Sequence, residues 1–340
     1  MKKVVSILLI IALTFSLVAC GGNQTQQPSN TGNTGNTTTD EKIVIRLGTA
    51  TEPDGSYVMG AKEFEKKVEE YTNGKVDVQI FPSSQLGNER DLIEGVSLGT
   101  LEMTVSSTGP LPNFSKDFQV FDLPYIVKDR ESAYKVMDGE VGQKILGTLE
   151  PIGIKALGFW ENGFRNLSNG KKEIVHPQDV AGLKIRTMEN PVHIASFKQL
   201  GAIPTPMAWG EVFTALQQGT IDGQENPLII FSTNKLNEAQ KYLSLTGHFY
   251  SPAVMMINKA AFDSYPQDVQ EAIVKAEQEA RAWERDFSKK SDEELVDKIK
   301  ATGVTVTEVD KAEWQEYLKP IYDQFRSEIN PEYIDALLGK

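Results

Sequence analysis

The alternation of strand and helix patterns early in the chain is the feature that most constrains its fold. Residues 42–50 (KIVIRLGTA) have a strand pattern. Apolar residues then recur at helical spacing from Val58 to Tyr71, and this pattern stops at Gly74, which is a good helix end. Residues 75–82 (KVDVQIFP) alternate with period two. Strand, helix and strand in this order predict a β-α-β unit, and therefore a mostly parallel sheet covered by helices.

A sustained apolar seam near the C-terminus predicts one long helix. About 300 residues follow the N-terminal segment, which is enough for two lobes with real hydrophobic cores. A helix from Gln267 to Lys300 would be about 50 Å long and would brace both lobes. A dimerising coiled coil is the alternative interpretation. The seam consists of Val269, Ile273, Ala276, Ala280, Trp283 and Phe287.

The first 41 residues predict export and a lipid anchor. A short basic segment precedes an apolar run (4–18) that is too short for a comfortable membrane span, which indicates a signal peptide over 1–19. Cys20 is the only cysteine, so we expect acylation there rather than an internal disulfide. A stray cysteine in an ordinary signal is the alternative. Residues 20–41 predict a flexible, lipid-anchored linker, and hence an extracytoplasmic protein attached to the cell membrane.

Charge and motifs exclude several classes of function. The formal net charge of -12 makes nucleic acid a poor partner. His176, His193 and His248 are widely separated and have no metal-ligand spacing. The sequence contains no nucleophile elbow, Walker loop or dinucleotide-binding glycine motif. We therefore expect no cofactor, no metal and no enzymatic activity.

Two arginines are candidates for a particular task, because the chain has only eight arginines against twenty-seven lysines. Arg165 in WENGFRNLSN and Arg186 in GLKIRTMENP both follow strand-like stretches. Ligands of open α/β sheets bind beyond the carboxyl ends of strands. A guanidinium can bind a carboxylate through two parallel hydrogen bonds. From these residues alone, an anion site and a structural salt bridge both remain open.

Four motifs together resemble one known family. They are SSQLGNERDLIEGVSLGTLEM, WENGFRNLSN, GLKIRTMENP and AIPTPMAWGEVFTALQQGTIDGQENP. Their order and separation are similar to those of the extracytoplasmic solute-binding subunit of tripartite ATP-independent periplasmic (TRAP) transporters, the DctP family, over nearly all of 42–340. The resemblance implies an α/β, two-lobed periplasmic-binding-protein-like (Venus flytrap) fold, with hinge strands and a long helix spanning both lobes.

The resemblance also implies a domain plan and partners. Lobe I would comprise 42–163 and a return segment, 247–286, that includes the start of the spanning helix. Lobe II would comprise 164–246 and 287–340 with the C-terminal helices. The protein would bind a small organic acid anion and deliver it to a TRAP permease of one small and one large membrane subunit.

The same resemblance implies the principal ligand contacts. Arg186 would be the main carboxylate-binding residue, and Arg165 would be the second arginine of the cleft. Asn226 in DGQENP would be a polar clamp, although it could instead cap the next helix. Trp209 in PMAWGE would cover the ligand, although it could instead belong to the core.

Further contacts are predicted from position alone. Glu52, Ser107 and Tyr125 lie near predicted strand ends and are nominated as contacts to ligand hydroxyls. Since these residues are neutral or acidic, they favour a sugar acid such as a uronate over a C4-dicarboxylate, which would require a second cation. Arg165 could supply that cation. A lipid-anchored surface adhesion or structural module without a small ligand is the alternative function.

Overall fold

The computed structural model describes residues 42–340. The predicted signal peptide (1–19), the linker (20–41) and Cys20 lie outside the described residues. Residues 42–340 belong to one compact unit, which contains every core described below, so a 40–340 fragment is suited to separate study. Within the described chain, no helix is both long enough and apolar enough to cross a membrane.

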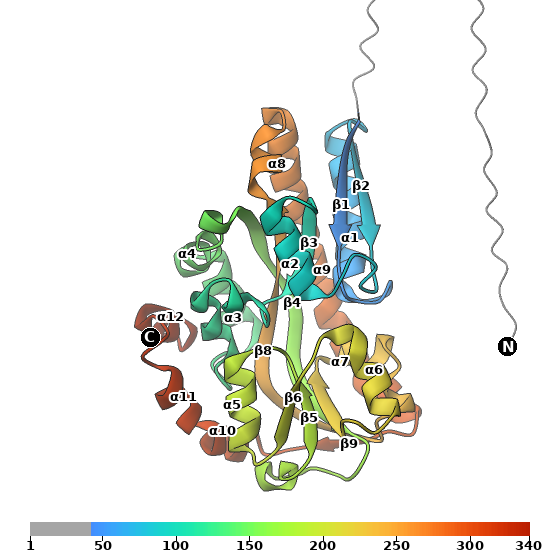
Figure 1. Ribbon diagram of the computed structural model, residues 1–340, viewed down its shortest axis with the longest axis vertical. Coiled ribbons are helices and arrows are strands. Elements are labelled where there is room, and N and C mark those ends of the chain that lie inside the picture. Colours follow the sequence, from blue (N-terminus) through green and yellow to red (C-terminus); the bar gives the residue numbers. More distant parts are fainter. Residues whose placement is uncertain (1–41) are drawn as a thin grey trace, which may run out of the picture. The chain divides into compact units, whose positions relative to one another are not determined.

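All nine strands of the described chain belong to one sheet (Figure 1). Their order is β2-β1-β3-β8-β4-β7-β5-β6, and β9 pairs with β8. The predicted β-α-β unit is confirmed, because β1 and β2 are parallel and α1 connects them. The strands are β1 (Ile43–Gly48), β2 (Val76–Phe81), β3 (Met103–Ser107), β4 (Ile154–Asn169), β5 (Lys184–Thr187), β6 (Ile203–Pro206), β7 (Gly223–Asn226), β8 (Tyr242–Asn258) and β9 (Thr305–Glu308).

The two long strands β4 and β8 connect the lobes. They pair antiparallel along almost their whole length. The C-terminal part of β8 lies beside β3, whereas its N-terminal part pairs with β9, and the end of β4 pairs with β7. The register shifts between Glu161 and Gly163, midway along β4, and the φ angle of 120° at Gly163 is one that glycine tolerates best. These strands are the expected hinge strands.

Helices cover both faces of the sheet and enclose three cores. One core lies against β1–β3 and one against α6 and α7, while the third combines residues from both parts of the sheet. The α-helices of the described chain are α1 (Ser56–Tyr71), α2 (Glu89–Leu98), α3 (Arg130–Asp138), α4 (Glu140–Gly147), α5 (Pro191–Gln199), α6 (Trp209–Gln217), α7 (Leu228–Thr233), α8 (Lys259–Ser264), α9 (Gln267–Ala301), α10 (Lys311–Leu318), α11 (Pro320–Phe325) and α12 (Pro331–Leu337).

Helix α9 is the long helix that the apolar seam predicts. It has 35 residues, which corresponds to about 52 Å. Its first half buries Ile273 and Ala280 in the core of β1–β3, and its second half buries Leu295 in the core of α6 and α7. Most of the seam is therefore buried within the same chain, without a coiled-coil partner. Trp283 is the exception, since it is 38% exposed and stacks on Phe287.

Candidate anion-binding cavity

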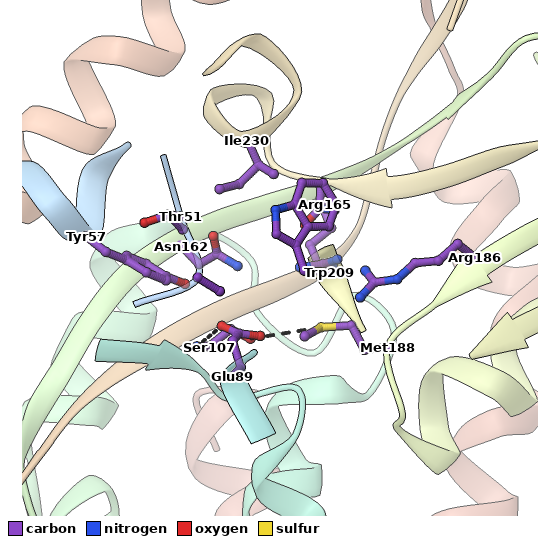
Figure 2. Close-up of a pocket in the computed structure, with 12 residues that line it drawn as sticks. Thr51, Tyr57, Glu89, Ser107, Asn162, Arg165, Arg186, Met188, Trp209 and Ile230 are labelled. Carbon is purple, nitrogen blue, oxygen red and sulfur yellow. Dashed lines mark hydrogen bonds between the residues drawn. The ribbon is translucent and has the colours of Figure 1, made fainter. Parts of the chain in front are cut away.

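A cavity with an empty volume of about 340 Å³ lies where α2, β3, β4, β5, β7 and α6 meet (Figure 2). Five of the seven ligand contacts predicted from the sequence line it, namely Ser107, Arg165, Arg186, Trp209 and Asn226. The remaining lining residues are Ala50, Thr51, Tyr57, Glu89, Asn162, Met188 and Ile230.

Arg186 is a buried cation that has no counter-ion among the described residues. It is the third residue of β5 and is only 3% exposed. Its Nε and Nη2 atoms both donate to the carbonyl oxygen of Met207, at 3.0 and 2.8 Å. Among residues 42–340 no carboxylate forms an ion pair with it.

The surroundings of Arg186 are those of an incomplete ion pair. Burial lowers the pKa of its guanidinium to about 10. Its Cζ atom lies 5.5 Å from the centre of the Trp209 ring, which is a cation-π contact. A buried charge without a partner is costly, so this geometry favours an anion entering the cavity beside Arg186.

Arg165 is buried too, but it already has a partner. Its Nε and Nη2 atoms donate to the two carboxylate oxygens of Glu225 at 2.5 and 2.8 Å, and Nη2 also donates to the Glu225 carbonyl at 2.6 Å. Both side chains are at most 1% exposed. Burial alone would raise the pKa of Glu225, but the charge and hydrogen bonds of Arg165, together with His248 and His193, outweigh burial and hold that pKa well below its ordinary value. The salt-bridge interpretation left open by the sequence thus describes Arg165 and not Arg186.

The wall opposite Arg186 is rich in groups that suit hydroxyls. Glu89, the first residue of α2, accepts hydrogen bonds from the Ser107 backbone N at 2.6 Å and from its Oγ at 2.9 Å (Figure 2). The Tyr57 hydroxyl and the Asn162 Oδ1 are buried without a hydrogen-bond partner among the described residues. Polar atoms of this kind are normally satisfied, by a ligand or by water where protein atoms are lacking.

Asn226 lines the cavity wall and does not cap α7, whereas Trp209 both lines the cavity and packs against a core. The amide of Asn226 donates to Gln224 Oε1 at 2.6 Å, and the residue that caps α7 is Pro227. Asn226 is therefore not the cap of that helix. Trp209 begins α6 and is partly buried against its core, while its ring lies near Arg186.

Glu52 and Tyr125 do not line the cavity, contrary to their nomination from position. Glu52 accepts a hydrogen bond from Ser83 Oγ at 2.8 Å, and its neighbour Thr51 faces the cavity instead. Tyr125 packs against the third core and donates to the Thr246 carbonyl at 3.0 Å. Nomination by nearness to a strand end failed here because it takes no account of side-chain direction.

Sequence reasoning missed Tyr57, Glu89, Asn162 and Met188. Glu89 and Asn162 lie within the motifs SSQLGNERDLIEGVSLGTLEM and WENGFRNLSN, so the motifs themselves were the available signal. Within residues 42–340 there is no group of three histidines, cysteines or acids arranged to hold a metal ion. Of the histidines, His248 lies 3.4 Å from Glu225 and so belongs to the ion pair behind the cavity.

Fold and cavity together define a two-lobed α/β binding protein, with the binding cavity between the lobes and a buried cation in its wall. The family model "Bacterial extracellular solute-binding protein, family 7" (DctP) matches residues 47–328. The chain belongs to this family.

Individual relatives agree with this assignment. The C4-dicarboxylate-binding periplasmic protein DctP of Rhodobacter capsulatus is 38% identical over 87% of this chain and 90% of its own. A TRAP periplasmic solute-binding protein from Polaromonas bound to D-erythronate has a TM-score of 0.85 at 41% identity, covering 87% of this chain and 98% of that one. A sugar acid binding protein from Advenella mimigardefordensis in complex with galactonate has a TM-score of 0.86 at 35% identity, covering 88% and 97%.

The family assignment confirms two expectations from the sequence. The resemblance to TRAP solute-binding subunits and the two-lobed α/β fold are both confirmed. The family consists of solute-binding proteins, so the protein is not an enzyme. Its members are extracellular or periplasmic and bind organic acids.

Proposed function

We propose that the protein captures one organic acid anion outside the cytoplasm and delivers it to the small and large membrane subunits of a TRAP permease. The ligand carboxylate binds Arg186, Asn226 orients it, and Trp209 covers it. The observation that supports this most is the buried guanidinium of Arg186, which within residues 42–340 has only the Met207 carbonyl as a hydrogen-bond partner. A bidentate carboxylate would satisfy it in a site that excludes water.

The preferred ligand is a sugar acid, such as a uronate or an aldonate, ahead of a C4-dicarboxylate. A second carboxylate facing Arg186 would meet the acid Glu89, whereas Arg165 is already neutralised by Glu225. Sugar hydroxyls could donate to Glu89 and bond with Tyr57 and Asn162. The ligands of the Polaromonas and Advenella proteins, D-erythronate and galactonate, are sugar acids. Arg165 contributes positive potential behind the carboxylate rather than a second ion pair.

The predicted acylation of Cys20 completes the proposal. It would hold the protein at the outer face of the cell membrane, close to the permease that receives the ligand.

A thermal-shift screen of the 40–340 fragment tests the function. The compounds are D-erythronate, D-galactonate, D-galacturonate, succinate and L-malate. A ligand at a hundred times its dissociation constant should add about 2.7 kcal/mol of apparent stability. We expect sugar acids to stabilise the fragment, and Arg186→Met to abolish the shift.

A matched variant tests the ligand preference. Glu89→Gln keeps the size and one acceptor oxygen but removes the negative charge, so succinate should gain affinity relative to D-galactonate. Tight succinate binding by the unaltered protein would overturn the sugar-acid preference. If no acid shifts the melting temperature after refolding, the binding function fails, and the adhesion module becomes the better explanation.

A further inference from the structure

Helix α6 has no N-terminal cap from its own segment. The residue at the cap position is Ala208, whose side chain cannot accept a hydrogen bond. The first turn of any helix leaves backbone N–H groups unsatisfied. In α6 the N–H of Gly210 donates to the side-chain Oδ1 of Asn88 at 3.0 Å. The cap of α6 is thus supplied by a residue 122 positions away in the chain.

Asn88 comes from the other side of the cavity. It immediately precedes α2, which packs against β3, whereas α6 belongs to the core shared with α7. Its backbone N–H donates to Asp91 Oδ2 at 2.9 Å, and this bond fixes Asn88 at the start of α2. Glycine at 210 suits the contact, since a Cβ atom there would lie 3.1 Å from the Asn88 Oδ1, closer than most such contacts.

The two helix starts joined by this bond carry opposite walls of the cavity. Helix α2 begins with Glu89, and α6 begins with Trp209, whose ring lies near Arg186. Beside the bond, Arg90 Nη1 lies 3.3 Å from Glu189 Oε2. That ion pair is about half exposed and weak by itself.

We propose that Asn88 is an interlobe cap, which completes α6 only when the lobes are closed and thereby couples closure to the placement of Trp209 over Arg186. Opening the cavity separates Asn88 from Gly210, so the first turn of α6 loses its cap and Trp209 loses its support. Asn88 is a positioning residue in this scheme, because it acts through Trp209. The inference rests on the proposed function, in which Trp209 covers the bound acid.

Two substitutions separate the role of Asn88 at the start of α2 from its interlobe bond to Gly210. Serine is as good an N-cap as asparagine, so Asn88→Ser preserves the start of α2, but its side chain is too short to reach Gly210. Aspartate keeps the acceptor oxygen at the same distance, so Asn88→Asp should retain the interlobe bond.

The test measures the distance between the lobes. The 40–340 fragment lacks cysteine, because the only one is Cys20, so dyes can be attached through Leu98→Cys in α2 and Ile203→Cys in β6, both exposed positions. Single-molecule energy transfer then reports closure, with and without D-galactonate. Stopped-flow fluorescence gives the association and dissociation rates of D-galactonate.

We expect Asn88→Ser, but not Asn88→Asp, to change lobe closure and ligand release. Asn88→Ser should lower the closed-to-open ratio and speed D-galactonate release, each by about three- to tenfold, with little change in association rate. Asn88→Asp should stay close to the unaltered protein, and both variants should keep its melting temperature. Equal closure and release in Asn88→Ser and the unaltered protein would overturn the proposal, as would equal defects in both variants.

This design separates the inference from the function on which it rests. If D-galactonate does not bind, the release measurement yields nothing and the proposed function is in question. The interlobe distance in the ligand-free fragment still tests whether Asn88 acts as an interlobe cap, because the bond between Asn88 and Gly210 needs no ligand.

Discussion

The two buried arginines differ in what their removal leaves behind. Without Arg165, Glu225 would remain as a buried carboxylate that has lost its arginine partner and keeps only the neighbouring histidines His248 and His193 among the described residues. Without Arg186, the Met207 carbonyl is the only acceptor in the described part of the chain that loses donors. We expect Arg165→Met to lower the free energy of unfolding by about 3–5 kcal/mol, and Arg186→Met to change it little when no ligand is present. Urea denaturation of the two matched variants measures both values, and similar losses would contradict the assignment of separate tasks.

The sequence predicted many residues of the cavity wall but not which of its two arginines is ion-paired. The motifs brought attention to Arg165 and Arg186 because both are rare arginines that follow strand-like stretches in the sequence, although the structure places Arg165 within β4. Which one is neutralised depends on Glu225, which β7 places against β4 through antiparallel pairing. Glu89 was missed for a similar reason, since it faces the cavity only once α2 has packed against β3. Such contacts arise from tertiary packing, which local patterns do not encode.

At the scale of elements, α9 carries a buried acid that periodicity alone does not explain. Glu284 is fully buried, and its Oε2 accepts a hydrogen bond from the Glu161 backbone N at 2.9 Å, while its Oε1 has no partner among the described residues. Burial raises the pKa of this carboxyl well above its ordinary value of 4.5. The folded protein therefore binds a proton at Glu284 more tightly than the unfolded chain does.

The raised pKa of Glu284 predicts a pH dependence of stability. Since the folded state holds this proton more tightly than the unfolded state, the stabilisation is complete below pH 4.5 and is lost as pH rises through the folded-state pKa. Glu284→Gln mimics the protonated form, so it should flatten the loss of stability toward alkaline pH. Denaturation measured from pH 5 to 9 checks this. A parallel pH profile in Glu284→Gln and the unaltered protein would show that Glu284 is ionised when folded.

Elements with strong periodicity were predictable, whereas the hinge strands were not predictable from local pattern. The spacing of apolar residues located α1, β2 and α9 to within a few residues. Strand β4 instead contains Asn162-Gly163, a dipeptide typical of turns. The strand continues because a register shift against β8 absorbs Gly163 with its positive φ angle. The family resemblance implied hinge strands but did not say that residues 154–169 form one of them.

At the scale of the whole molecule, the two lobes share their cores. The third core combines Phe159 from the first half of β4 with Leu167 from the second half, and it includes Phe197 of α5 and Trp314 of α10. Helix α9 contributes to each of the other two cores. Neither lobe therefore has a complete core that is independent of β4 and α9.

Shared cores predict that the 40–340 fragment unfolds in one transition, although chains of this size often show intermediates. Phe197→Ala, which empties a site in the third core, should lower the free energy of unfolding by about 3–5 kcal/mol and shift the whole transition. Tryptophan fluorescence reports mainly the packing around buried side chains such as Trp160 and Trp314, and far-ultraviolet circular dichroism reports the helices. Coincident curves from the two probes, displaced together by Phe197→Ala, are the expected result. Two separate transitions, with only one moved by the substitution, would show that the lobes unfold independently and that closure alone links them.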